Sequence, residues 1–147
     1  MEPCDDLQGA EEENEQPWSE CRYDEHLVLV VEDNLINQKI AQGILEDLGA
    51  QVEVVDNGEE GLNAFLQKDY ALILMDVRMP VMDGLEATRC IRASDKHDAA
   101  TVPIIAMTAN AMQEDHAASR EAGMNEHIAK PIDIDLLKKT LFIHLKA

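Results

Sequence analysis

Short apolar runs recur along the chain from residue 27 onward, and stretches with helical spacing separate them. Five runs are present, at residues 27–31, 52–55, 71–75, 104–107 and 127–129. The first, third and fourth are continuous rather than alternating, which is typical of strands buried on both faces of a sheet. The second carries Glu53, as an edge strand can. The pattern therefore predicts five strands.

The stretches between and after these runs predict five helices. The first is an apolar stripe that ends before Gly49 and consists of Ile36, Ile40, Ala41, Ile44, Leu45 and Leu48. The other four are expected at residues 57–66, 85–91, 111–122 and 134–141, with Asp133 as the cap of the last. Strands that alternate with helices predict an α/β fold, in which a single parallel sheet carries helices on both faces through right-handed crossovers.

Residues 1–26 differ in composition from the rest of the chain. They hold ten acidic residues against one base, Arg22, and so carry −9 of the formal net charge of −18. Few apolar residues accompany these charges, and Trp18 is the one residue suited to anchoring the segment. We interpret residues 1–26 as a disordered acidic tail or a linker, and residues 27–147 as one domain.

Charge and composition also limit the partners and the compartment. A strongly acidic chain repels phosphate backbones and anionic lipid, so neither nucleic acid nor a membrane is an expected partner. The apolar runs are far shorter than the roughly 20 residues that span a bilayer. Three widely spaced cysteines without a secretion signal indicate reduced thiols, and we expect a cytoplasmic protein.

Polar residues follow four of the predicted strands. Glu32 and Asp33 follow the first, Asp76 the third, Thr108 the fourth and Lys130 the fifth. Each alone is explained as a loop or capping residue, but the carboxyl ends of parallel strands share one edge, where ligands bind. Crowded carboxylates need a compensating cation, and ligands that are all oxygen favour Mg²⁺.

Four segments at these strand ends resemble the receiver domain of two-component response regulators. They are Val30–Asn34, Leu74–Gly84, Ile105–Ala109 and Ala129–Pro131. The resemblance extends over about residues 27–146, and the segment from Glu32 to Gln38 is similar to receivers of hybrid sensor histidine kinases. It implies a flavodoxin-like sheet with strand order 2-1-3-4-5 and a function in a phosphorelay.

The resemblance also implies a role for each residue at the edge. Asp76 would accept a phosphoryl group from a phosphohistidine. Asp33 and Asp76 would bind Mg²⁺ directly, Glu32 through water, and Arg78 through its backbone carbonyl. Lys130 would contact a phosphoryl oxygen as a point charge.

A conformational response is implied as well. Thr108 would donate a hydrogen bond to the new phosphoryl group and open space for a side chain on the last strand. The family usually has Tyr or Phe where this chain has His127, which is either the switch residue or simply a packed or exposed histidine. Many members of the family also have Asp at the position where this chain has Glu32.

Two functions stay open at this point. The first is a phosphoacceptor that acts with a sensor histidine kinase, a histidine-phosphotransfer protein, or both, as a monomer or weak dimer. The second is a receiver-like interaction scaffold that works without phosphorylation. We expect no independent enzymatic turnover beyond self-phosphorylation and self-dephosphorylation. An aspartate-based phosphatase is disfavoured because Arg78 stands where its second aspartate would be.

Overall fold

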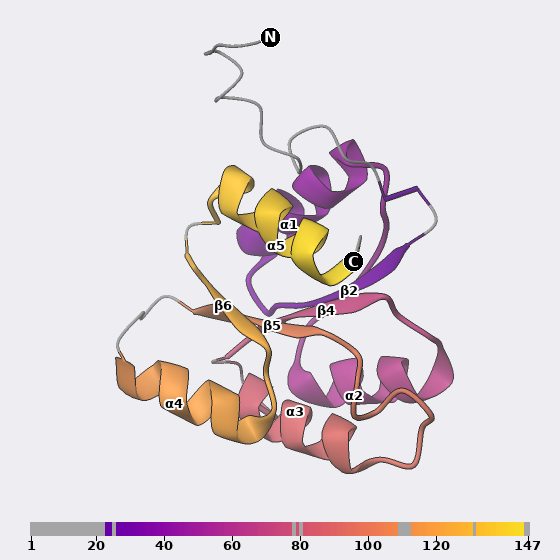
Figure 1. Cartoon of the computed structure of the whole chain (residues 1–147), viewed down its shortest axis with the longest axis vertical. Coiled ribbons are helices and arrows are strands. Elements are labelled where there is room, and N and C mark those ends of the chain that lie inside the picture. The colour runs from indigo at the N-terminus through magenta and orange to yellow at the C-terminus, as the bar shows by residue number, and fades with distance from the viewer. Residues whose placement is uncertain are drawn as a thin grey trace, which may run out of the picture.

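The computed structural model describes residues 23–24, 26–77, 79, 81–108, 113–130 and 132–145. Strands and helices alternate along this part of the chain (Figure 1). They are β2 (Leu27–Val31), α1 (Leu35–Asp47), β3 (Gln51–Val55), α2 (Gly58–Gln67), β4 (Leu72–Asp76), α3 (Gly84–Ala93), β5 (Ile104–Thr108), α4 (Gln113–Ala122), β6 (Glu126–Ala129) and α5 (Ile134–Leu145).

The five strands form one parallel sheet in the order β3-β2-β4-β5-β6. In order of appearance along the chain this is 2-1-3-4-5, so the predicted fold class and strand order are confirmed. Helices α1 and α5 lie over one face of the sheet, and α2, α3 and α4 lie over the other (Figure 1). None of the helices among the described residues has both the length and the apolar character that a membrane span requires.

The core has two parts, one on each face of the sheet. Val28 and Val30 of β2 pack toward α1 and α5, while Leu29 and Val31 pack toward α2 and α3. Successive strand residues point to opposite faces, so a strand buried on both sides must be apolar throughout. This explains the continuous runs in β2, β4 and β5. Strand β3 lies at an edge and is only partly buried, as its Glu53 indicated.

The N-terminal boundary of the folded part lies earlier than the sequence indicated. Tyr23 is only 1% exposed and belongs to the core on the α1 side, although residues up to 26 were assigned to the tail. Its backbone N–H donates to Leu48 O at 2.9 Å, and its ring contacts His26 edge to face. An isolated aromatic residue in an acidic segment leaves no periodic pattern, so the sequence alone placed Tyr23 in the tail. Disorder was predicted for residues 1–26; residues 1–22 of this segment lie outside the described part, so for them it stays a prediction.

Helix α1 buries its predicted apolar stripe only in part, since Ala41, Leu45 and Leu48 lie in the core but the first residues of the stripe do not. Ile36 and Ile40 are 69% and 42% exposed, whereas the buried residues of the helix are Gln38, Ala41 and Leu45. Apolar residues occur on more than one side of α1, so spacing alone did not identify the inner one. The buried position at Gln38 is polar, which also concealed the correct face.

Candidate functional site

Side chains from four strands meet at the carboxyl edge of the sheet. Glu32 and Asp33 follow β2, Asp76 ends β4, Thr108 ends β5 and Lys130 follows β6. One carboxylate oxygen from each of Glu32, Asp33 and Asp76 lies within 4.8 Å of the others. The structure thus brings together the acids that the sequence placed at this edge.

Lys130 lies between two of these acids. Its Nζ is 2.9 Å from Glu32 Oε1 and 3.1 Å from Asp76 Oδ2. The side chain of Lys130 is 16% exposed, while Glu32 and Asp76 are almost fully shielded from water. The ammonium therefore compensates two buried carboxylates at once, which their burial requires.

The site shifts the pKa values of its groups. Burial, followed by repulsion from Glu32, raises the pKa of Asp76 to about 6, although Lys130 opposes the rise. Burial disfavours the charge of Lys130, but the ion pairs with Glu32 and Asp76 outweigh it and raise its pKa above the ordinary value. At neutral pH, Asp76 is thus an ionised carboxylate in an unfavourable environment.

A close backbone approach shapes the site behind Asp76. A Cβ atom on Gly84 would lie 2.2 Å from Asp76 O, so only glycine allows α3 to begin here. The Gly84 N–H donates to Val77 O at 2.9 Å, and Asp83 caps α3 by accepting from the Glu86 N–H. The turn after β4 is therefore folded back onto the strand that carries Asp76.

Glu32 is fixed by its neighbours along the chain. Its Oε2 accepts a hydrogen bond from the Asn34 backbone N–H at 3.0 Å, and Asn34 in turn caps α1 by accepting from the Asn37 N–H. The second oxygen of Glu32 faces Lys130. With both oxygens engaged, Glu32 is less free than the exposed Asp33 to approach a cation directly.

The ends of β5 and β6 hold the remaining predicted residues. Thr108 is 3% exposed, and its carbonyl accepts from the Lys130 backbone N–H at 2.8 Å. His127 is half-buried on β6 opposite Ala106 and on the same face of the sheet as Thr108. Its role as a switch stays a prediction. Arg78, predicted to offer its backbone carbonyl, lies outside the described residues.

The donor set at this edge fits a hard divalent cation. Three carboxylates and one ammonium leave a formal charge of −2 in a largely buried site. Among the described side chains that form it, the metal-ligand atoms are all carboxylate oxygens, which Mg²⁺ prefers over the nitrogen and sulfur ligands that suit zinc or copper.

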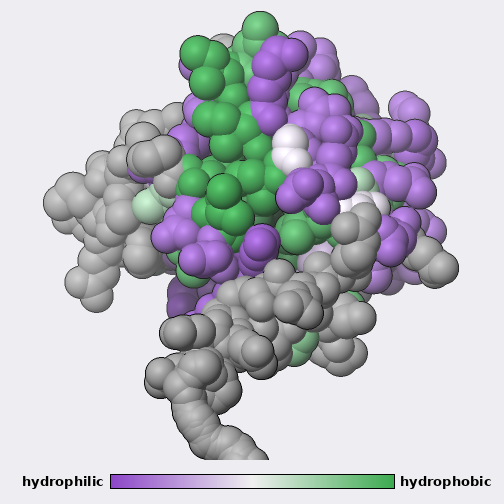
Figure 2. Space-filling model, turned by 90° about the horizontal axis from the view of Figure 1, so that it is seen from above, coloured by the Kyte–Doolittle hydropathy of each residue, from purple (hydrophilic) through white to green (hydrophobic). Residues whose placement is uncertain are grey.

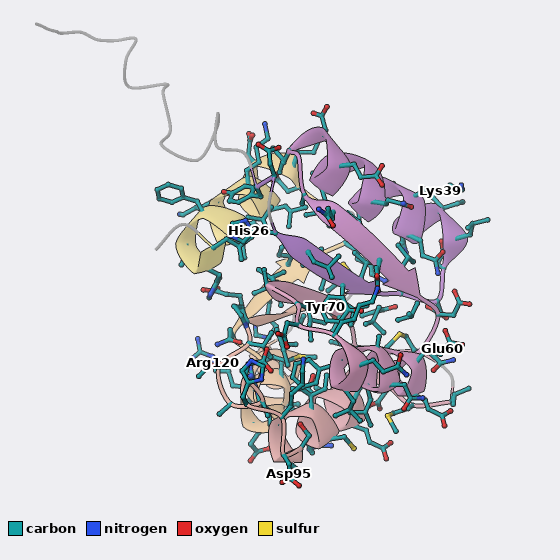
Figure 3. All side chains as sticks on the ribbon, turned by 90° about the vertical axis from the view of Figure 1, so that its right-hand side faces the viewer. His26, Lys39, Glu60, Tyr70, Asp95 and Arg120 are labelled. Carbon is teal, nitrogen blue, oxygen red and sulfur yellow. The ribbon has the colours of Figure 1, made fainter. Side chains whose placement is uncertain are left out.

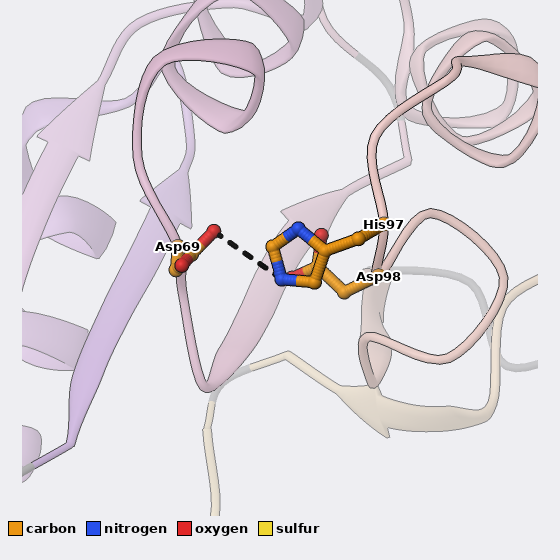
Figure 4. Close-up of side chains that lie close together, drawn as sticks. All are labelled: Asp69, His97 and Asp98. Carbon is orange, nitrogen blue, oxygen red and sulfur yellow. Dashed lines mark ion pairs between the residues drawn. The ribbon is translucent and has the colours of Figure 1, made fainter.

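A second group of side chains with metal-ligand atoms lies elsewhere, and no sequence motif pointed to it. Asp69 precedes β4, and His97 and Asp98 lie between α3 and β5 (Figure 4). Lys96 already compensates these acids, because its Nζ is 3.1 Å from Asp69 Oδ1 and 3.6 Å from Asp98 Oδ1. His97 Nε2 is 3.8 Å from Asp69 Oδ1. We interpret this group as an ion-pair network that joins two loops.

Comparison with known proteins gives the same family as the sequence motifs. Residues 28–142 match the response regulator receiver domain. The chain is 42% identical over 106 residues to the sensor protein GacS of Pseudomonas syringae pv. syringae, and this match covers 71% of the chain but 12% of that protein. The chain therefore spans only a small part of the length of the curated relatives it matches.

Solved structures are similar over most of the chain. The receiver domain of sensor histidine kinase PA1611 from Pseudomonas aeruginosa PAO1 is 40% identical with a TM-score of 0.77, covering 83% of this chain and 98% of that one. That domain has a magnesium ion coordinated in its active-site cleft. A chain in the co-crystal structure of the Saccharomyces cerevisiae phosphotransfer protein Ypd1 with the receiver domain of Ssk1 is 32% identical, with a TM-score of 0.75 and coverage of 83% and 90%.

Proposed function

Since the chain belongs to the response regulator receiver domain family, of the type found in hybrid sensor histidine kinases, we propose that it accepts a phosphoryl group from a phosphohistidine onto Asp76 in a Mg²⁺-dependent phosphorelay. The observation that carries the proposal is the convergence of Glu32, Asp33 and Asp76 within 4.8 Å, with Lys130 against two of them. Phosphoryl transfer needs mainly positioning and neutralisation of charge, and this arrangement offers both.

In the proposed step, an Asp76 carboxylate oxygen attacks phosphorus in line with the P–N bond of the donor. The P–O bond forms as the P–N bond breaks, and its electron pair returns to the imidazole nitrogen. Asp76 must be ionised to attack, and a pKa of about 6 keeps it ionised at neutral pH. The product is an aspartyl phosphate on this chain.

Asp33 and Asp76 would hold Mg²⁺ directly, and Glu32 would do so through water because its oxygens face Asn34 and Lys130. When bound, the cation offsets the charge of the carboxylates and of the incoming phosphoryl oxygens. Lys130 exchanges its pair with Asp76 for a phosphoryl oxygen and keeps its pair with Glu32. Thr108 then donates its hydroxyl, and His127, on the same sheet face, moves into the space behind it.

A protein partner is supported by exposed apolar side chains beside the site. Leu35 and Ile36 at the start of α1 are 63% and 69% exposed, and Val81 in the loop after β4 is 74% exposed. Figure 2 shows apolar surface among polar surface on the side of α1 and α5. Helix α1 begins two residues after Asp33, so its exposed start lies next to the site, and we propose that a sensor histidine kinase or a histidine-phosphotransfer protein contacts these side chains.

The decisive experiment for the function is intact mass measurement after incubation with acetyl phosphate, with and without Mg²⁺. One phosphoryl group should be gained only with Mg²⁺, and Asp76→Asn should gain none. A folded wild-type protein that gains no mass would favour the alternative of an interaction scaffold. We propose no other turnover, so free phosphate should appear only through slow hydrolysis of the acyl phosphate on Asp76.

The partner surface is tested separately by Ile36→Asp. This variant should accept phosphate from acetyl phosphate at the wild-type rate but from a phosphorylated histidine-phosphotransfer protein at least about tenfold more slowly. Ile143→Asp is the matched control, because Ile143 is 48% exposed on α5. If Ile36→Asp slowed phosphorylation equally with acetyl phosphate and with the phosphotransfer protein, the effect would lie in the site itself and would contradict the proposed docking.

A further inference from the structure

One polar side chain of α1 faces the interior among apolar neighbours. The buried residues of this helix are Gln38, Ala41 and Leu45, and Gln38 is 9% exposed. A buried amide destabilises the fold unless its donors are paired. The polar character of this position therefore requires an explanation in the contacts that Gln38 makes.

Both N–H groups of the Gln38 amide are used at the carboxyl edge of the sheet. Nε2 donates to the backbone carbonyl of Glu32 at 2.6 Å and to Asp56 Oδ1 at 2.8 Å. Both partners are acceptors only, so the amide nitrogen, and not its oxygen, must face them. Gln38 thus joins the β2–α1 loop to the β3–α2 turn with a fixed orientation.

The first of these bonds acts on the peptide group between Glu32 and Asp33. Gln38 donates to the carbonyl oxygen of that peptide. The hydrogen bond therefore fixes the direction of the peptide group from which the Asp33 backbone continues. On the other side, the Glu32 N–H donates to Val55 O at 3.1 Å, and Glu32 Oε2 accepts from the Asn34 N–H. Glu32 is therefore held at its backbone N–H, at its carbonyl and at its side chain.

The second bond extends the connection to the loop after Asp76. Asp56 precedes α2, and the Gly58 N–H at the start of this helix donates to Met82 O at 3.0 Å. A Cβ atom on Gly58 would lie 2.4 Å from that oxygen, so the two backbones are in direct contact. Lys39 on α1 and Glu60 on α2 lie on the same side of the molecule (Figure 3).

We propose that Gln38 is a positioning residue for the cation site, which orients the Glu32–Asp33 peptide and connects it through Asp56 to the β3–α2 turn. The inference rests on the proposed function, since it concerns the same acids. Groups that orient metal ligands without touching the metal commonly change metal affinity by about 10- to 100-fold when they are replaced. Gln38 holds a ligand's backbone rather than a ligand atom, so we expect the lower end of this range.

The test is the affinity for Mg²⁺ of the whole chain, measured by isothermal titration calorimetry without any phosphodonor. Gln38→Met keeps the size of the side chain and removes both hydrogen bonds, and it should raise the Kd for Mg²⁺ about tenfold. Gln42→Met is the matched control, because Gln42 lies one turn further along the same helix and its amide, within the described part of the chain, donates to Glu46 and not to the site. Its Kd should stay within twofold of the wild type.

Thermal unfolding separates positioning from a purely structural role. A structural role would lower Tm equally with and without Mg²⁺, whereas the proposal expects a smaller Mg²⁺-induced rise of Tm in Gln38→Met. Should that variant fail to fold, Asp56→Ala removes one of the two bonds at an exposed position and should raise the Kd severalfold.

An unchanged Kd in Gln38→Met, or in Asp56→Ala where that variant is used, would overturn the inference while leaving the proposed function intact. A wild-type protein that binds no Mg²⁺ would instead contradict the proposed function.

Discussion

Replacing Asp76 by asparagine should stabilise the fold at neutral pH when no divalent cation is present. Burial and repulsion from Glu32 raise the pKa of Asp76 from 3.8 to about 6, so ionised Asp76 is disfavoured in the folded state. Such a rise corresponds to about 3 kcal/mol of unfavourable free energy once Asp76 is ionised. The asparagine side chain would carry no charge, so the variant should be more stable by about 1 to 3 kcal/mol; the pKa of about 6 already includes the opposing effect of the ion pair with Lys130.

The pH dependence of this gain follows from the direction of the shift. Because the folded state has the higher pKa, it binds a proton that the unfolded state has lost between about pH 4 and pH 6. The contribution of Asp76 to stability is therefore lost as the pH rises through this window. The stability difference between Asp76→Asn and the wild type should be small near pH 4, grow up to pH 6 and level off above about pH 7.

Urea unfolding followed by circular dichroism, in the presence of EDTA, measures this difference at each pH. Asp95→Asn is a suitable control, because Asp95 is exposed (Figure 3), and its stability should stay within about 0.5 kcal/mol of the wild type. If Asp76→Asn is no more stable than the wild type at neutral pH, or if the difference does not grow with pH, the reasoning about crowded carboxylates is wrong.

Three further replacements test other parts of the structure by the same unfolding assay. Lys130→Met leaves the buried carboxylates of Glu32 and Asp76 without their cation and should cost about 3 kcal/mol in EDTA; a loss below about 1 kcal/mol would contradict the paired geometry. Tyr23→Ala should lower the free energy of unfolding by about 3 kcal/mol because the ring of Tyr23 is buried. An unchanged free energy of unfolding would show that Tyr23 belongs to the tail. Gly43→Ala should stabilise α1 by up to about 1 kcal/mol, since a Cβ atom at this position would have no other atom within 4 Å. Destabilisation by this replacement would contradict that geometry.

Much of the fold and of the site could be predicted from the sequence because both follow from the ends of strands. The strands β2, β4 and β5 are buried on both faces, so they appear as continuous apolar runs whose ends are marked by the first polar residue. In a parallel sheet the carboxyl ends of all strands, that of β6 included, lie at one edge, which brings Glu32, Asp76 and Lys130 together without any knowledge of side-chain positions.

Contacts between loops could not be predicted in this way. The Asp69–His97 contact joins residues that precede two different strands, and no periodicity relates them. The sequence identified Gln38 only as the last residue of the Glu32–Gln38 segment and did not predict its burial, since a polar residue in an amphipathic helix is normally assigned to the exposed face. Its burial depends on two acceptors, Glu32 O and Asp56, that only the packed structure brings within reach.

The position of Lys130 reconciles two conflicting requirements on Asp76. Burial shields Asp76, the proposed acceptor, from water, but a carboxylate that is desolvated without a cation becomes protonated at neutral pH and could not attack phosphorus. Lys130, whose Nζ is 3.1 Å from Asp76 Oδ2, opposes this effect, so that the pKa of Asp76 stays at about 6 and its carboxylate remains ionised at neutral pH. If Asp76 accepts a phosphoryl group as proposed, the same ammonium would be close enough to contact the phosphoryl oxygens. Because it pairs with both Glu32 and Asp76, it can leave one of them and still be paired with the other.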